Sequence, residues 1–118
     1  MWNTTIDPTG DACVVALDGD LDLHVVERLR ETLGAAIAQS RNLVLDVSNV
    51  AFVDSTGLGA LVRAHHTAKQ KEGVLYLAGA NRVLRSVLHV TGLESRFPAF
   101  PDVPTAIGFL PSRGDQAA

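Results

Sequence analysis

The sequence predicts a single α/β domain built on a mixed, mainly parallel sheet. Short apolar segments rich in β-branched residues alternate with longer segments, in which apolar residues recur at steps of three and four. With 118 residues, 47% of them hydrophobic, the chain can bury one working core. We expect residues 1–110 to form this domain, with about four helices, and residues 111–118 to form a flexible tail.

The sheet is expected to open with a β-hairpin. Residues 4–6 are β-branched, residues 7–10 are turn formers, and residues 12–17 form an apolar run. This run does not alternate with polar residues, which indicates that both of its faces are covered. Residues 19–22 are expected to end the strand and to lead into a first helix. The apolar stripe of this helix consists of Val26, Leu29, Leu33, Ala36 and Ile37.

A third strand and a second helix form the centre of the predicted domain. The strand covers residues 43–47, whose apolar character suits an interior parallel position. The helix covers about residues 56–72, and Gly73 is placed to cap its C-terminus. The packed face of this helix would consist of Leu58, Leu61, Val62, His65 and Ala68.

The last part of the chain predicts shorter elements. Residues 74–78 form a fourth strand, and residues 81–91 form a third helix that Gly92 stops. A short final strand over residues 97–100 and a last short helix over residues 104–110 complete the domain. The buried stripe of the third helix would consist of Leu84, Val87, Leu88 and Thr91.

Composition excludes several classes of function. The net charge is −3, with 13 acidic against 10 basic residues, so DNA or RNA is not expected as a direct partner. Cys13 is the only cysteine, and no pair of histidines has a convincing metal-ligand spacing. The N-terminus lacks the pattern of a signal peptide, and no apolar stretch is long enough to span a bilayer. We therefore expect a cytoplasmic protein without membrane insertion, metal or cofactor.

The most informative segment is Asp-Ser-Thr-Gly-Leu-Gly at residues 54–59, between a strand and a helix. In open α/β sheets, ligand-binding and partner-binding sites are commonly located in turns between a strand and the following helix. Ser55 would lie at the helix N-terminus, where backbone N–H groups lack partners and anions are favoured. One interpretation is an N-cap at Asp54, Ser55 or Thr56, with Gly57 easing close packing. The other is a phosphate on Ser55, held by the same N–H groups; the two are compatible.

At this segment the sequence resembles a known family. Residues 45–58, Leu-Asp-Val-Ser-Asn-Val-Ala-Phe-Val-Asp-Ser-Thr-Gly-Leu, look like the central motif of the STAS family. The most similar branch is the bacterial anti-sigma factor antagonists. Residues 19–22 resemble the strand-to-helix turn of that branch, and residues 82–85 and 91–93 resemble its third helix and exit. The resemblance covers about residues 4–110 and implies a STAS-like fold.

The resemblance also implies a function. The serine after the motif aspartate is the phosphorylated residue of the family, which here is Ser55, with Thr56 as a less favoured neighbour. The implied partner is an anti-sigma factor with a serine kinase fold that brings the ATP. The unmodified antagonist binds it and releases the sigma factor, phosphorylation ends the binding, and a serine phosphatase resets the cycle. The chain itself would catalyse nothing. The proposed partner-binding residues are Asp20, Asp22, Asp54, Thr56, Gly57 and Leu58, with Asp54 orienting the turn and Gly57 letting the partner's active site approach.

Two other classes stay open. A STAS subunit of a lipid-transport or stress-sensing complex would bind its partners whatever the state of Ser55. A small-molecule or nucleotide-binding domain is the other class, although Gly57 and Gly59 give only an incomplete dinucleotide fingerprint. No Lys-Ser or Lys-Thr follows these glycines, as a phosphate-loop ATPase would require.

Overall fold

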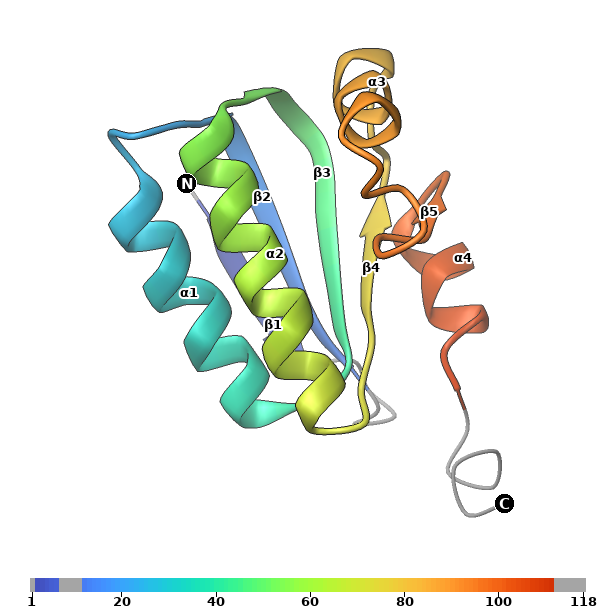
Figure 1. Ribbon diagram of the computed structural model, residues 1–118. Coiled ribbons are helices and arrows are strands. Elements are labelled where there is room, and N and C mark those ends of the chain that lie inside the picture. The colour runs from blue at the N-terminus through green and yellow to red at the C-terminus, as the bar shows by residue number, and fades with distance from the viewer. Residues whose placement is uncertain (1, 7–11, 112–118) are drawn as a thin grey trace.

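The computed structural model describes residues 2–6 and 12–111 of the protein. Within these residues the chain forms a five-stranded sheet and four helices (Figure 1). The strands are β1 (Asn3–Ile6), β2 (Cys13–Leu21), β3 (Leu43–Val53), β4 (Leu75–Ala78) and β5 (Ala99–Phe100). The helices are α1 (Val26–Gln39), α2 (Ser55–Gln70), α3 (Arg82–Val90) and α4 (Val103–Gly108). The predicted turn at residues 7–10, and the predicted tail apart from Pro111, lie outside the described residues.

The sheet confirms the predicted mixed, mainly parallel α/β architecture. The strands follow the order β1-β2-β3-β4-β5. β1 pairs antiparallel with β2, and every later pair is parallel. Figure 1 shows α1 and α2 side by side on one face of the sheet. Because β2 and β3 are parallel, the chain leaves both strands at the same edge, where Leu21 is paired with Val53.

Two cores lie on the two faces of the sheet. Alternate residues of β3 separate them: Leu43, Leu45 and Val47 belong to the larger core with α1 and α2, whereas Val44 belongs to the smaller one. The smaller core contains Ala106 of α4, together with residues of β3, β4 and β5. The stripe predicted for α1 is confirmed, since the buried residues of this helix are Val26, Leu29, Leu33, Ala36 and Ile37.

The strands that lead to the candidate site are longer than predicted. β2 continues to Leu21 and β3 to Val53, and two register shifts in their pairing absorb the turn-forming residues around Gly19. The prediction that both faces of residues 12–17 are covered is confirmed only in part: Ala12 is buried in the smaller core and Val14 packs against it. Val14 and Ala16 are only half-buried, whereas Cys13, Val15 and Leu17 are buried, because the short α4 covers mainly the other strands.

The buried face of α2 also differs from the prediction. Its buried residues are Gly57, Ala60, Leu61, Ala64 and Ala68. Leu58, Val62 and His65, which were expected on this face, are only half-buried. The small side chains at positions 60 and 64 let α2 approach α1 and the sheet closely. Alanine carries little hydrophobic signal, so a pattern based on large apolar residues misplaces the face by part of a turn.

The end of α2 is closed by Glu72 rather than by the expected Gly73. Glu72 has a φ of 59° and donates its N–H to the Lys69 carbonyl, while Gly73 donates to the Ala68 carbonyl at 2.7 Å. This is a Schellman motif with a glutamate at its left-handed position. Gly73 is required for another reason: a Cβ at this residue would lie 2.0 Å from the backbone oxygen of Arg41.

Glu72→Gly is therefore expected to stabilise the protein by about 0.5–1 kcal/mol, because glycine adopts a positive φ without strain. α3 supplies the matched control, since Gly92 occupies the same position of its Schellman motif with a φ of 73°. Gly92→Ala should destabilise by about 1–2 kcal/mol. Urea unfolding of both variants measures the two effects. A Glu72→Gly variant less stable than the wild type would contradict the expected strain.

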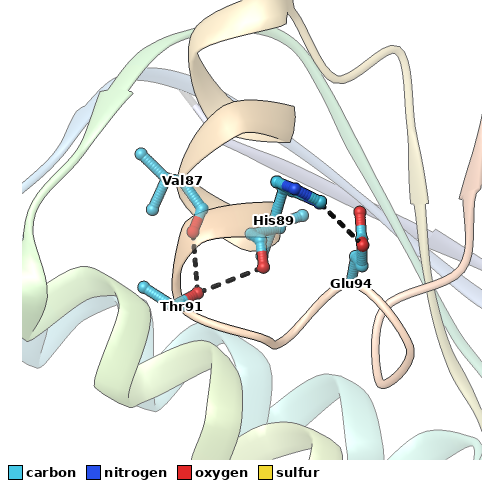
Figure 2. Close-up of polar contacts among 5 residues, drawn as sticks. Val87, His89, Thr91 and Glu94 are labelled. Atoms are coloured by element: carbon cyan, nitrogen blue, oxygen red, sulfur yellow. Dashed lines mark hydrogen bonds and ion pairs between the residues drawn. The ribbon is translucent and has the colours of Figure 1, made fainter.

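The C-terminus of α3 is held by its own side chains (Figure 2). The hydroxyl of Thr91 donates to the carbonyl oxygens of Val87 at 2.7 Å and Leu88 at 3.3 Å, and His89 Nδ1 lies 2.9 Å from Glu94 Oε1. Thr91 was expected on the buried stripe, but it is exposed because its hydroxyl turns back onto the helix end. Gly92 ends the helix as predicted.

Candidate functional site: a serine at the first turn of α2

Ser55 is the first residue of α2, directly after β3 and the N-cap residue Asp54. Its side chain is exposed and makes no hydrogen bond to another residue of the described segments. The neighbouring hydroxyl differs. Thr56 is half-buried, and its Oγ1 donates to Asp54 Oδ1 at 2.6 Å. Of the two adjacent hydroxyl groups, only that of Ser55 is therefore free to react with a partner.

Asp54 ties together the two turns at this edge of the sheet. Its Oδ1 accepts the N–H of Gly57 at 2.9 Å, and its Oδ2 accepts the N–H of Leu23 at 3.1 Å. Its own N–H donates to the carbonyl of Leu21 at 3.1 Å. The carboxylate thus caps α2 and also holds the loop that leads from β2 to α1. The predicted orienting role of Asp54 has a direct structural basis in these bonds.

The hydrogen bonds at Asp54 keep its side chain ionised. The Thr56 hydroxyl, followed by the Gly57 N–H, lowers the pKa of the Asp54 carboxyl below its ordinary value. Asp54 takes one donor of the first turn, the Gly57 N–H, and so acts as the N-cap that one interpretation of the sequence expected. An acidic cap is favourable at this end of a helix, where the helix dipole stabilises negative charge. That the first turn also holds a phosphate on Ser55 stays a prediction.

Asp54→Asn tests this cap through pH. Asparagine keeps a capping oxygen but has no charge and cannot accept from both Gly57 and Leu23 in the same way. Because the pKa of Asp54 is lower in the folded state, its stabilisation is present above the unfolded pKa of about 4 and is lost as pH falls through the folded value. We expect the stability gap between wild type and variant to shrink below about pH 4, measured by urea unfolding across pH. A gap independent of pH would contradict a lowered pKa.

Gly57 eases close packing, as one interpretation of the sequence expected. It is buried, and a Cβ at this position would lie 2.2 Å from the backbone oxygen of Leu21. The glycine therefore lets the first turn of α2 pack against the end of β2 in its own chain. Its predicted role in letting a partner's active site approach stays a prediction. Leu58 is half-buried and packs against the larger core, so only part of its side chain is available.

The other predicted acidic residues lie beside this turn. Asp20 is exposed in the last part of β2, and Asp22 is half-buried, with Oδ1 accepting the N–H of His24 at 3.0 Å. The two turns lie side by side, since Asp54 bonds to both Leu21 and Leu23. The structure therefore brings the carboxylates of residues 20, 22 and 54 to the same edge of the sheet as the Ser55 hydroxyl.

Three further residues at this edge were not predicted from the sequence. Leu23 and Phe52 are large apolar residues with exposed fractions of 67% and 48%, and both flank the segment that carries Ser55. Asn81 caps α3 by accepting the Leu84 N–H at 2.8 Å, and its Nδ2 donates to the Val50 carbonyl at 3.1 Å. Phe52 could have been suspected, because an aromatic residue just before a polar turn has no obvious place in a core. The Asn81 contact spans 31 residues and has no local signal.

The fold and the site define a small α/β domain that presents the exposed Ser55 hydroxyl on a hydrogen-bonded turn. The sequence matches the STAS domain family over residues 3–106, and the chain belongs to that family. It is 29% identical over 96 residues to an anti-sigma F factor antagonist of Paenibacillus polymyxa, covering 80% of this chain and 82% of that protein. It is 31% identical over 81 residues to an anti-sigma-B factor antagonist of Staphylococcus aureus, covering 68% and 75%.

A solved structure shares the fold. An anti-sigma factor antagonist from Mycobacterium paratuberculosis superposes with a TM-score of 0.77 and 27% identity, covering 92% of each chain. Within the described residues, no helix is both long and apolar enough to cross a membrane. Nor does the described part of the chain contain a group of three or more His, Cys, Asp or Glu residues suited to a metal ion.

Proposed function

We propose that this protein is an anti-sigma factor antagonist that acts in the cytoplasm and is switched by phosphorylation of Ser55. One observation carries the proposal: the Ser55 hydroxyl is exposed and unbonded within the described residues, on a turn that Asp54 holds in place. The family membership and the two antagonist relatives support the partner class. The partner is an anti-sigma factor of the serine kinase type, and its capture releases the sigma factor.

The unmodified surface suits a protein partner. Leu23 and Phe52 expose apolar side chains near Ser55, and burying them on binding would supply hydrophobic driving force. The turn itself needs little reorganisation, because hydrogen bonds from Leu23 and Gly57 to Asp54 already fix it. A preorganised surface loses less conformational entropy when a partner docks.

Phosphorylation would end this binding through charge. The kinase partner transfers the γ-phosphoryl group of its ATP to Oγ of Ser55; the bond to the β-phosphate breaks, ADP leaves, and the hydroxyl proton is lost. In this role the chain is a substrate of phosphoryl transfer. The phosphate adds about −1.5 to −2 charges beside existing carboxylates. A serine phosphatase restores the binding state by hydrolysis of the phosphoserine.

The test is incubation with the anti-sigma factor kinase of the same organism and Mg-ATP, followed by intact-mass and peptide mass spectrometry. We expect one phosphoryl group, mapped to Ser55. Ser55→Ala should remain unmodified. Thr56→Ser is the matched control, because it keeps a hydroxyl able to bond Asp54, and it should be modified like the wild type. A phosphate on residue 56, or kinase binding without any modification, would contradict the proposed switch.

A further inference from the structure

A depression lies along α2 and begins about one helical turn after Ser55. A hollow of about 800 Å³ extends over α2 from Gly59 to Lys69 and reaches the loop between α3 and β5, which contributes Arg96. A second hollow of about 200 Å³ continues toward Leu75 and Tyr76 of β4. His65, Lys69 and Arg96 line both, so we treat the two as one site, the α2–loop hollow. Figure 1 shows α2 and this loop on the same face of the sheet.

The α2–loop hollow concentrates positive charge in a protein whose net charge is −3. Arg63, Lys69 and Arg96 carry permanent charges, His66 lies beside them, and no Asp or Glu lines either part. None of these three cations forms an ion pair with a carboxylate of the described residues. Cations gathered without a counter-charge repel one another, and a bound anion would relieve that repulsion.

His65 adds an unsatisfied polar atom at the same place. Its Nδ1 is buried without a hydrogen-bond partner among the described residues, while its ring packs against that of Phe97 with centroids 5.5 Å apart. Burial, followed by the charges of Lys69, Arg96 and His66, lowers the pKa of His65. A buried polar atom without a partner costs free energy of folding. An unsatisfied nitrogen at this place is therefore a feature that packing alone does not explain.

We propose that the α2–loop hollow binds a small soluble anion that carries two or more phosphate groups. Arginine side chains come from two separate elements, α2 and the loop before β5, and each can form paired hydrogen bonds with phosphate oxygens. Lys69 adds a third positive charge. Three positive charges are more than the single negative charge of one carboxylate would balance. The volume of the larger part falls within the range of small-molecule sites.

The Lys69 end of this hollow is distant from the proposed phosphorylation site. Ser55 and Lys69 lie fourteen residues apart on one helix, which corresponds to roughly 21 Å along its axis. That distance exceeds the Debye length of about 8–10 Å, so the charge of Lys69 is largely screened from Ser55 at physiological salt, although Gly59 at the near end of the hollow lies one helical turn from Ser55. Ligand binding in the hollow is therefore expected to persist in Ser55→Ala, and it does not depend on the antagonist function.

Titration calorimetry with pyrophosphate tests the proposal, with sulfate at matched ionic strength as the reference anion. The wild type should bind pyrophosphate with a clearly higher affinity than sulfate. Arg96→Gln and Lys69→Gln should each weaken binding about tenfold or more, as expected for a lost charge-assisted hydrogen bond. Arg85→Gln is the matched control, because Arg85 is an exposed arginine of α3 outside the hollow. The affinity of this variant for pyrophosphate should stay within about twofold of that of the wild type.

Amide chemical shifts then locate the site. We expect pyrophosphate to shift residues 59–69 and the loop that contains Arg96, and to leave residues 54–57 unchanged. Equal binding of sulfate and pyrophosphate, equal losses in Arg96→Gln and Arg85→Gln, or shifts centred on the start of α2 would each overturn the assignment. Thermal unfolding of the variants confirms that they fold, and exposed positions 69 and 96 should tolerate glutamine.

Discussion

Ser55→Asp is expected to weaken binding to the anti-sigma factor kinase by roughly 30-fold to several thousand-fold, whereas Ser55→Ala should bind as the unmodified protein does. The reason lies in the surroundings of the hydroxyl. The carboxylates of Asp20, Asp22 and Asp54 lie at the same edge of the sheet, and Asp54 already uses the Gly57 N–H. A new negative charge at residue 55 finds this donor occupied. Leaving it poorly paired in an interface costs on the order of 2–5 kcal/mol.

The affinity of the purified proteins can be measured by titration calorimetry. Gln70→Glu is the matched control, because it adds the same charge at the other end of α2, roughly 22 Å away along the helix. Charges at that distance are largely screened, so its affinity should stay close to that of the wild type. Equal affinities of Ser55→Asp and Ser55→Ala would reject the charge mechanism. An equal loss in Gln70→Glu would show a general effect of net charge.

Some of this structure is visible in the sequence because one physical signal dominates locally. The stripe of α1 consists of large apolar residues such as Leu29 and Leu33, so its face is read correctly from periodicity. The start of α2 is marked by Asp54, a capping residue before a helical pattern. A residue that follows an N-cap lies on the first turn, where it tends to face solvent. The exposure of Ser55 follows from that placement.

Other features depend on contacts between distant segments. Ala60 and Ala64 are buried because small side chains permit close approach, which a hydrophobic pattern does not record. β2 extends through Gly19 because its pairing with β3 shifts register, an adjustment that needs both strands. The α2–loop hollow is lined by both Lys69 and Arg96, which lie far apart in the sequence. Such features follow from the way the elements assemble, and the local sequence carries no sign of them.

Gly57→Ala is expected to destabilise the fold by about 2–3 kcal/mol, and so to lower the unfolding temperature by several degrees. An added Cβ would lie 2.2 Å from the backbone oxygen of Leu21 and 3.1 Å from its Cβ. The colliding atom belongs to the backbone at the end of β2, so no rotamer change can relieve the contact. Either the strand end or the first turn of α2 must move.

Gly59→Ala, two residues further along α2, is the matched control. A Cβ there meets nothing within 4 Å, so this variant should gain up to about 1 kcal/mol from helix propensity alone. Urea unfolding of the two variants should therefore separate them by about 3 kcal/mol in opposite directions from the wild type. Because the Gly57 N–H bonds to Asp54, the displaced turn should also slow phosphorylation of Ser55. A Gly57→Ala protein as stable as the wild type would mean that the two turns do not need this close approach.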